Sequence, residues 1–123
     1  MVDDDPDIRR IAALSLGRIG GFRVASAPGA EDAMAEIAQD RPDLVLLDVT
    51  MPGMDGPGAL AAIHALPGPQ IPVIFFTATS CDEEVDRLRS LGALGVVPKP
   101  FDVADLPRRI RAILSDAGID LAR

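Results

Sequence analysis

Short runs of consecutive apolar residues, separated by longer segments with helical spacing, constrain the fold of this chain more than any other feature. Three such runs occupy residues 43–48, 71–77 and 95–99, and residues 22–25 can form a further strand. Continuous apolar character indicates strands buried on both faces, because a half-exposed strand would alternate apolar and polar residues. The chain is therefore predicted to build a parallel sheet with helices on both faces.

Segments with helical periodicity lie between the predicted strands, and each carries apolar residues at spacings that share one helix face. Asp82 and Asp102 stand where N-cap residues are expected, and the charged residues after Asp82 are expected to form a solvated face. Alternating strands and helices predict one α/β module spanning residues 1–123, without a linker or second domain. The predicted helices cover residues 6–19, 30–39, 58–66, 82–91 and the segment after 102, with Ile8, Ile11, Ala12, Ile19, Met34, Ile37, Ala38, Leu106, Ile110, Ile113 and Leu114 facing inward.

Composition narrows the classes of function. The chain has 123 residues, the size of one domain, and a formal net charge of -7. An acidic surface repels nucleic acid, so direct binding to DNA or RNA is not expected.

The single cysteine, Cys81, excludes an internal disulfide and is typical of a reducing compartment. No apolar run reaches the roughly 18–20 residues that span a membrane, and the first residues do not resemble a signal peptide. The expected location is the cytoplasm.

Polar residues follow the apolar stretches where each predicted strand ends. They are Asp3 with Asp4, Asp48, Thr77 and Lys99. Ligands of open parallel sheets bind beyond the carboxyl ends of the strands, so these side chains are expected at one edge. Three close carboxylates repel one another unless a cation joins them, and Mg²⁺ is a hard ion that prefers carboxylate, water and phosphate oxygens.

A carboxylate in such a site can attack phosphorus and form an aspartyl phosphate. The protein then has to position the reacting groups and neutralise charge on the phosphoryl oxygens, which a metal ion, Lys99 and the Thr77 hydroxyl could do. Lys99 is the only lysine among 12 basic residues, which suggests a need for a compact point charge at this position.

Four motifs resemble, in order and over essentially the whole chain, a bacterial two-component response-regulator receiver domain (CheY-like). They are Val2-Asp3-Asp4-Asp5-Pro6, residues 48–56 (DVTMPGMDG), Thr77-Ala78 and Lys99-Pro100-Phe101. The resemblance implies a flavodoxin-like (βα)5 three-layer sandwich, in which a five-stranded parallel sheet has the order 2-1-3-4-5. It also implies a cis peptide bond between Lys99 and Pro100.

By this resemblance the chain is a phosphorylation-activated switch that receives its phosphoryl group from a histidine kinase or phosphotransfer protein. It assists its own phosphorylation and dephosphorylation but is not a dedicated enzyme. Its output would pass to a downstream protein or a covalently linked output domain, and a phosphorylation-dependent homodimer is left open. The implied site consists of Asp48 as phosphoacceptor, Asp3, Asp4, Asp48 and the Thr50 backbone carbonyl as Mg²⁺ ligands, Thr77 and Lys99 on the phosphoryl oxygens, and Thr50 and Thr79 as rate-setting neighbours.

Two departures from the family pattern change what is expected. Receivers often carry an aromatic ring three residues before the lysine, where this chain has Val96. Switching would therefore use Thr77 and the following loop. Only Met1 and Val2 precede Asp3, against a mean strand length of about 5–6 residues. Either the first strand is very short, or upstream residues are missing from this sequence.

Other interpretations compete with the switch. The same fold could serve as a constitutive interaction module without phosphorylation, although such proteins usually lose an acidic or lysine position. A flavin-binding or small hydrolytic α/β protein is disfavoured, since the chain lacks a glycine-rich phosphate loop and a Ser-His-Asp set. Taken alone, Asp48 could be an ordinary aspartate in a turn after a strand. Asp3 and Asp4 could likewise belong to a solvent-exposed run of acidic residues at the N-terminus. His64 is not expected to be a phosphohistidine or a metal ligand, and Cys81 is expected to be a small loop residue.

Overall fold

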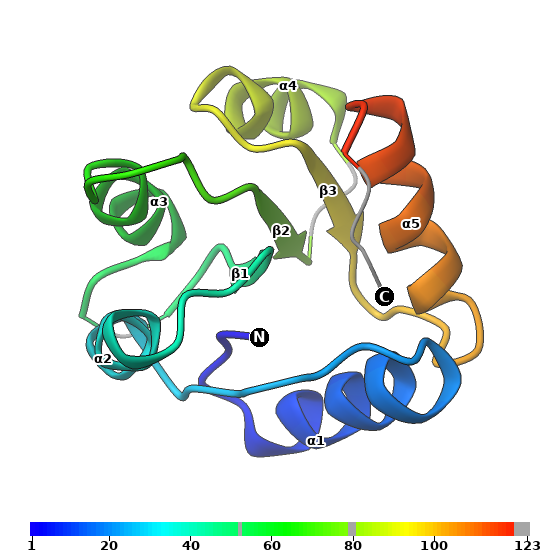
Figure 1. Ribbon diagram of the computed structural model, residues 1–123. Coiled ribbons are helices and arrows are strands. Elements are labelled where there is room, and N and C mark those ends of the chain that lie inside the picture. Colours follow the sequence, from blue (N-terminus) through cyan, green and yellow to red (C-terminus); the bar gives the residue numbers. More distant parts are fainter. Residues whose placement is uncertain (52, 79–80, 120–123) are drawn as a thin grey trace.

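The computed structural model describes residues 1–51, 53–78 and 81–119. Its centre is a parallel sheet of three strands in the order β1-β2-β3 (Figure 1). These are β1 (Val45–Asp48), β2 (Val73–Thr77) and β3 (Gly95–Pro98). Asp48 pairs with Phe76, and Thr77 pairs with Pro98, so the carboxyl ends of the strands meet at one edge.

Two further segments extend the sheet beyond β1 by single bridges. Val2 makes parallel bridges to Ala27 on one side and Leu47 on the other. The spatial order is therefore Ala27, Val2, β1, β2, β3, which agrees with the predicted 2-1-3-4-5 arrangement. The predicted strand over residues 22–25 was wrong: no strand is assigned there, and pairing occurs at Ala27. Because the central segment supplies only one bridging residue, residues 22–25 have no neighbouring strand with which to form a ladder.

Helices cover both faces of the sheet, as predicted (Figure 1). One hydrophobic cluster joins a sheet face to α2, α3 and α4, and a second joins the other face to α1 and α5. Val73 and Phe75 of β2 enter the first cluster, whereas Ile74 and Phe76 enter the second. The helices are α1 (Pro6–Leu14), the π-helical turn η1 (Ser15–Ile19), α2 (Ala30–Gln39), α3 (Gly56–His64), α4 (Asp82–Ser90) and α5 (Leu106–Asp116).

The buried stripes of the first two helices differ from the prediction. In the first helical segment Ala12 and Leu16 are buried, while Ile11 is 40% and Ile19 is 56% exposed. A π-helical turn accounts for the exposure of Ile19, since the N–H of Gly20 donates to Ser15 O at 3.0 Å, five residues back. Ile11 lies before this turn, in α1. In α2 the buried residues are Ala30, Ala33 and Ile37; Met34 is only partly buried and Ala38 is exposed.

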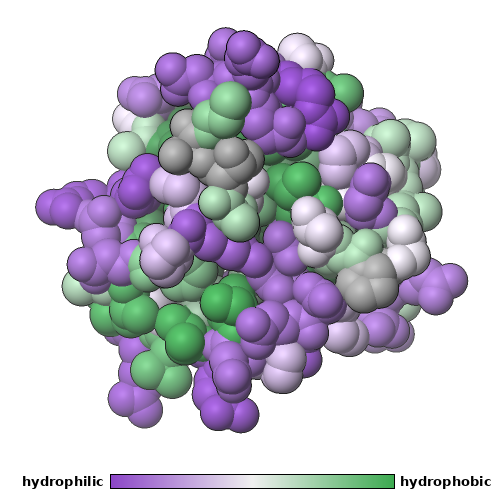
Figure 2. Space-filling view, turned by 180° about the vertical axis from the view of Figure 1, so that it is seen from behind, coloured by the Kyte–Doolittle hydropathy of each residue, from purple (hydrophilic) through white to green (hydrophobic). Residues whose placement is uncertain are grey.

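The two predicted N-cap residues, Asp82 and Asp102, do not occupy the N-cap positions of α4 and α5. Asp82 is the first residue of α4, which has Cys81 at its N-cap. Asp102 accepts the Ala104 N–H at 2.8 Å and closes the turn before α5, rather than capping the helix itself. Hydrophilic side chains gather at the top of Figure 2, where Figure 1 places α4, in keeping with the predicted solvated face. No helix in the described ranges combines the length and hydropathy needed to cross a bilayer.

Gly56 lets α3 begin directly against the end of β1. Its N–H donates to Val49 O at 2.8 Å. A Cβ at this position would lie 2.6 Å from Asp48 O and 2.7 Å from Val49 Cα, which are both backbone atoms. The β1–α3 turn that presents Asp48 therefore requires glycine for close approach.

Replacing Gly56 with Ala is expected to lower the free energy of unfolding by about 2–3 kcal/mol, because the new methyl group collides with backbone that cannot move aside. Urea unfolding followed by circular dichroism measures the change. Gly17→Ala is the matched control, since the nearest heavy atom to its Cβ would lie 3.8 Å away. Equal stability of the two variants would contradict this account of the turn.

Candidate functional site

The structure brings the predicted polar residues together at the carboxyl edge of the sheet. Asp48 ends β1, Thr77 ends β2, Lys99 follows β3, and Asp3 follows the bridging residue Val2. The Lys99 N–H donates to Thr77 O at 2.7 Å, which fixes the segment after β3 against β2. The Lys99–Pro100 peptide bond is cis, as the resemblance implied.

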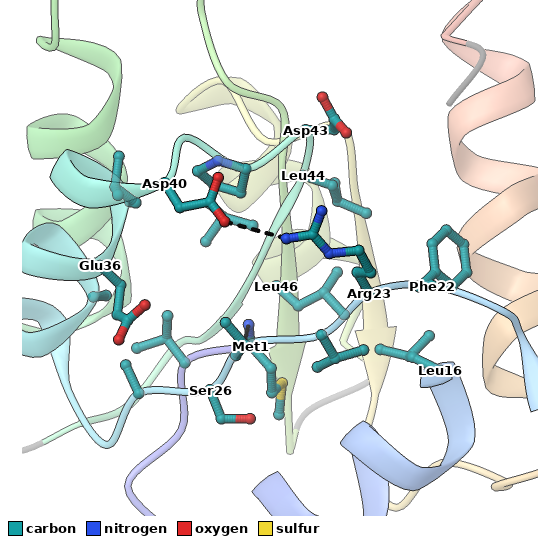
Figure 3. A pocket seen from close by; sticks show the side chains of 18 of the residues that line it. Met1, Leu16, Phe22, Arg23, Ser26, Glu36, Asp40, Asp43, Leu44 and Leu46 are labelled. Atoms are coloured by element: carbon teal, nitrogen blue, oxygen red, sulfur yellow. Dashed lines mark hydrogen bonds and ion pairs between the residues drawn. The ribbon is translucent and has the colours of Figure 1, made fainter. Parts of the chain in front are cut away.

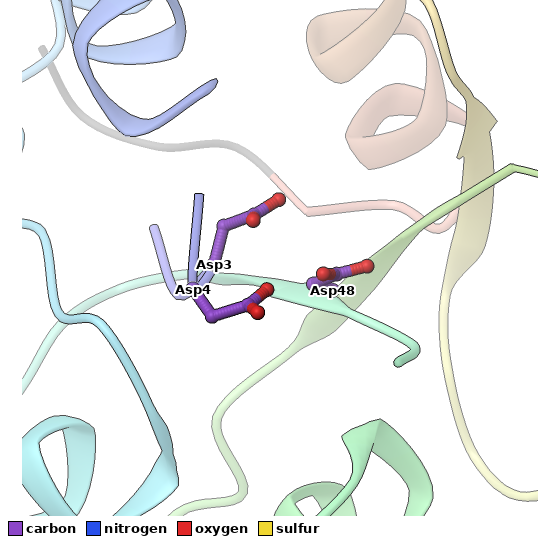
Figure 4. Close-up of side chains that lie close together, drawn as sticks. All are labelled: Asp3, Asp4 and Asp48. Carbon is purple, nitrogen blue, oxygen red and sulfur yellow. The ribbon is translucent and has the colours of Figure 1, made fainter. Parts of the chain in front are cut away.

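Three carboxylates form an acidic cluster at this edge. One oxygen each of Asp3, Asp4 and Asp48 lies within 4.8 Å of the others. Figure 4 shows Asp3 and Asp4 extending from one segment toward the side of Asp48. Asp3 is fully buried, Asp48 is 7% exposed, and Asp4 is exposed to solvent. Carboxylate oxygens at this spacing could hold a hard metal ion.

Lys99 places one positive charge inside the acidic cluster. Its Nζ lies 2.7 Å from Asp3 Oδ2 and 3.2 Å from Asp48 Oδ1. Burial lowers the pKa of Lys99, but its hydrogen bonds to Asp3 and Asp48 outweigh burial, and the net pKa is raised. Lys99 is therefore a permanent cation that bridges the two buried acids.

The surroundings of Asp48 oppose its ionisation. Burial raises the pKa of Asp48 first, and the charge of Asp3 raises it further. Three contacts lower the pKa of Asp48 without cancelling this rise: the hydrogen bond from Lys99, the positive charge of Lys99, and the Thr50 N–H, which lies 3.4 Å from Asp48 Oδ1. Lys99 alone thus leaves the cluster short of positive charge, which is the condition that favours binding a cation.

Asp3 is held by contacts that the sequence did not reveal. Asp3 Oδ1 accepts the Asp5 N–H at 2.9 Å, and Arg9 donates through a guanidinium nitrogen to Asp3 O at 2.7 Å. Asp5 also accepts the Asp7 N–H and caps α1. Arg9 was not predicted, because nothing in its sequence context distinguishes it from the other arginines.

The remaining predicted residues lie around this cluster or outside the described residues. Thr77 is 4% exposed at the end of β2. Val96 is partly buried and packs against the first hydrophobic cluster. An aromatic pair, Phe76 with Phe101, has ring centroids 5.3 Å apart. Thr79 lies outside the described residues. Within the described part of the chain, His64 and Cys81 belong to no group of potential metal ligands.

Comparison with known proteins agrees with this geometry. A family model described as the response regulator receiver domain matches residues 1–111. The chain is 37% identical over 120 residues to the transcriptional regulatory protein PrrA of Mycobacterium tuberculosis, covering 96% of this chain and 50% of that protein. It is 40% identical over 114 residues to the transcriptional regulatory protein AfsQ1 of Streptomyces coelicolor, covering 93% and 49%. The chain thus spans about half the length of the curated relatives it matches.

Solved structures show the same fold. Chemotaxis protein CheY4 of Vibrio cholerae superposes with a TM-score of 0.83 at 28% identity, over 92% of this chain and 94% of that one. The BeF3-activated DrrB receiver domain superposes with a TM-score of 0.78 at 31% identity, over 93% of each chain. The chain therefore belongs to the response regulator receiver domain family, the signalling domains of two-component systems. The predicted family and flavodoxin-like fold are confirmed.

The raised pKa of Asp48 predicts how stability depends on pH without metal. Between the unfolded pKa of Asp48 and its higher folded pKa the native state binds more protons, so stability falls as pH rises through this window. Asp48→Asn removes that fall and is expected to raise the free energy of unfolding near pH 7 by about 1 kcal/mol. The measurement is urea unfolding from pH 4 to 8 in EDTA.

The matched control is Asp86→Asn, which removes the same charge from the exposed face of α4. If it stabilises as much as Asp48→Asn, the effect is net charge alone and the account is wrong.

Proposed function

We propose that this domain is a phosphorylation-activated switch of a two-component phosphorelay and that Asp48 accepts the phosphoryl group. A carboxylate oxygen of Asp48 attacks the phosphorus of a phosphohistidine on a histidine kinase or phosphotransfer protein. The phosphorus–nitrogen bond breaks, and the imidazole leaves and takes up a proton. The observation that carries the proposal is the gathering of Asp3, Asp4, Asp48 and Lys99 at one sheet edge in a chain of this family.

Mg²⁺ is the cofactor that the donor set fits best. The proposed ligands are Asp3, Asp4, Asp48 and the backbone carbonyl of Thr50, all of them hard oxygen donors. Bound Mg²⁺ supplies positive charge that offsets the charge of the transferred phosphoryl group. Asp4 is exposed and available for direct contact. Both carboxylate oxygens of Asp3 already accept hydrogen bonds, from Asp5 and Lys99, so Asp3 acts partly through water.

Thr77 and Lys99 are proposed to bind the phosphoryl oxygens once Asp48 is modified. Phosphorylation adds roughly -1.5 to -2 charges next to the Lys99 ammonium, which then exchanges carboxylate for phosphoryl oxygen. Since Val96 offers no ring, the change would spread through Thr77 and the loop after β2. Thr50 and Thr79 remain the proposed rate-setting neighbours.

The output of the switch is proposed to pass through protein contacts. Two relatives are transcriptional regulatory proteins about twice as long as this chain, so a covalently linked output domain or a separate downstream protein would respond. Residues 1–123 would form a single cytoplasmic receiver domain. The domain would assist its own phosphorylation and dephosphorylation without being a dedicated enzyme, and its acidic surface disfavours direct contact with nucleic acid.

Incubation with acetyl phosphate and Mg²⁺ is expected to add one phosphoryl group, which intact-mass spectrometry detects. Replacing Mg²⁺ by EDTA and replacing Asp48 with Asn are each expected to abolish the adduct, whereas the exposed control Asp86→Asn keeps it. An adduct on Asp48→Asn would assign the acceptor elsewhere. Folded, Mg²⁺-binding protein that gives neither an adduct nor a beryllofluoride response would instead be a constitutive interaction module.

Replacing Lys99 with Ala is expected to slow phosphorylation by acetyl phosphate roughly 100-fold, because one charged donor to the phosphoryl oxygens is lost. Lys99→Arg is expected to recover only part of the rate, since a planar guanidinium cannot replace a compact ammonium between two acids. A time course of intact masses measures both rates, and circular dichroism verifies folding. Arg89→Ala removes an exposed cation of α4 as the control. A wild-type rate for Lys99→Ala would contradict the role given to Lys99.

A further inference from the structure

The segment that carries the first two acids of the acidic cluster leaves the sheet between Asp3 and Asp4. Val2 bridges to the backbone on both sides, and the Asp3 N–H still donates to Ala27 O at 3.2 Å. The next main-chain acceptor along the segment, Asp3 O, is bound by a side chain, because a guanidinium nitrogen of Arg9 donates to it at 2.7 Å. A hydrogen bond from Arg9 therefore continues the support of this segment beyond its pairing in the sheet.

The opposite end of the same segment plays no part in the acidic cluster. Met1 lies at a cavity of about 430 Å³ between residues 22–27 and residues 42–46 (Figure 3). The described residues that line this cavity include no member of the acidic cluster. The bond from Arg9 is made at the other end, where the segment turns toward Asp48 (Figure 4).

Helix α1 begins directly after this segment and holds Arg9 over it. The side chain of Asp5 caps the helix, Pro6 occupies its first position, and the Arg9 N–H donates to Asp5 O at 3.1 Å. Side chains on a helix point back toward its N-terminus, so a long side chain one turn into α1 reaches the backbone that precedes the cap. Arg9 is accordingly half-buried, whereas its neighbour Arg10 is exposed.

Arg9 donates to a neutral carbonyl although four carboxylates precede it closely in the sequence. These belong to Asp3, Asp4, Asp5 and Asp7. Within the part of the chain that the structure describes, Arg9 forms no ion pair with any of them. A guanidinium that served only to balance charge would be expected to lie on a carboxylate, which is its preferred acceptor. The contact with Asp3 O instead indicates a role in holding the backbone.

The bond from Arg9 fixes the direction in which Asp4 leaves the backbone. Asp3 O belongs to the planar peptide that joins Asp3 to Asp4, so a donor on this oxygen orients the whole peptide. The Asp3 carboxylate is held separately, by the Asp5 N–H at 2.9 Å and by Lys99 at 2.7 Å. The Asp4 carboxylate is exposed, and no described residue donates a hydrogen bond to it. Its place in the acidic cluster therefore depends on its backbone.

We propose that Arg9 is a positioning residue of the metal site, which directs the Asp4 carboxylate toward Asp48 by holding Asp3 O and so raises the affinity for a divalent cation. The inference rests on the proposed function, in which Asp4 contacts Mg²⁺ directly. Charge and position predict opposite effects of removing Arg9. Loss of a nearby positive charge would strengthen the binding of a cation, whereas loss of a group that orients a ligand weakens it.

The test measures binding of Mn²⁺, in place of Mg²⁺, by electron paramagnetic resonance of the free ion. Arg9→Ala is expected to raise the dissociation constant roughly tenfold, as loss of a ligand-orienting group does. Arg9→Lys, which keeps a charged donor, should recover part of the affinity. Arg10→Ala removes the same charge from the adjacent exposed position and should not weaken binding. Circular dichroism verifies folding of each variant. An unchanged or lower dissociation constant for Arg9→Ala would overturn the proposal.

A double variant tests whether Arg9 acts through Asp4. In an Asp4→Asn chain, adding Arg9→Ala should change the dissociation constant of Mn²⁺ by less than about twofold, because the carboxylate that Arg9 directs is gone. A tenfold loss in both backgrounds would overturn the proposal. If the original chain binds no Mn²⁺, the proposed metal site fails together with the role of Arg9. If the original chain and Arg9→Ala bind Mn²⁺ equally well, only the role of Arg9 fails.

Discussion

A desolvated pair of carboxylates, held together by one lysine, is the constraint on which the rest of this structure depends. Asp3 and Asp48 lie buried at the same sheet edge, and Lys99 bridges them at 2.7 and 3.2 Å. Buried like charges are unfavourable unless a cation compensates them, and the raised pKa of Asp48 shows that Lys99 compensates incompletely. Such a cluster lowers the stability of the metal-free fold, and its excess negative charge favours the binding of a metal ion.

The fold delivers these groups through the geometry of parallel strands. Because β1, β2 and β3 run in one direction, residues far apart in the sequence end at one edge. Each strand is anchored by alternate residues in two hydrophobic clusters, so the edge rests on a rigid base. Gly56 allows α3 to start directly beside Asp48. The geometry of the acidic cluster is therefore a consequence of core packing as much as of the polar residues themselves.

The three strands at the centre of the sheet and the polar residues at their carboxyl ends could be predicted from the sequence, whereas the outer part of the sheet and the contacts around the site could not. The runs ending at Asp48, Thr77 and Lys99 are continuous and apolar, so their burial and common edge follow from strand direction. The first two strands could not be predicted in the same way, because their pairing depends on a central segment that contributes only Val2. The π-helical turn that exposes Ile19 and the hydrogen bond from Arg9 to Asp3 O have no local pattern in the sequence that could have predicted them.

The most direct measurement of the central claim is a crystal structure of the protein with Mn²⁺, in place of Mg²⁺, and beryllofluoride. The account predicts an anomalous-scattering peak among Asp3, Asp4, Asp48 and the Thr50 carbonyl, with beryllofluoride on an Asp48 oxygen and Lys99 and Thr77 turned toward its fluorines. A metal peak elsewhere, or an unmodified Asp48 with Lys99 still bridging Asp3 and Asp48 in saturated crystals, would contradict it.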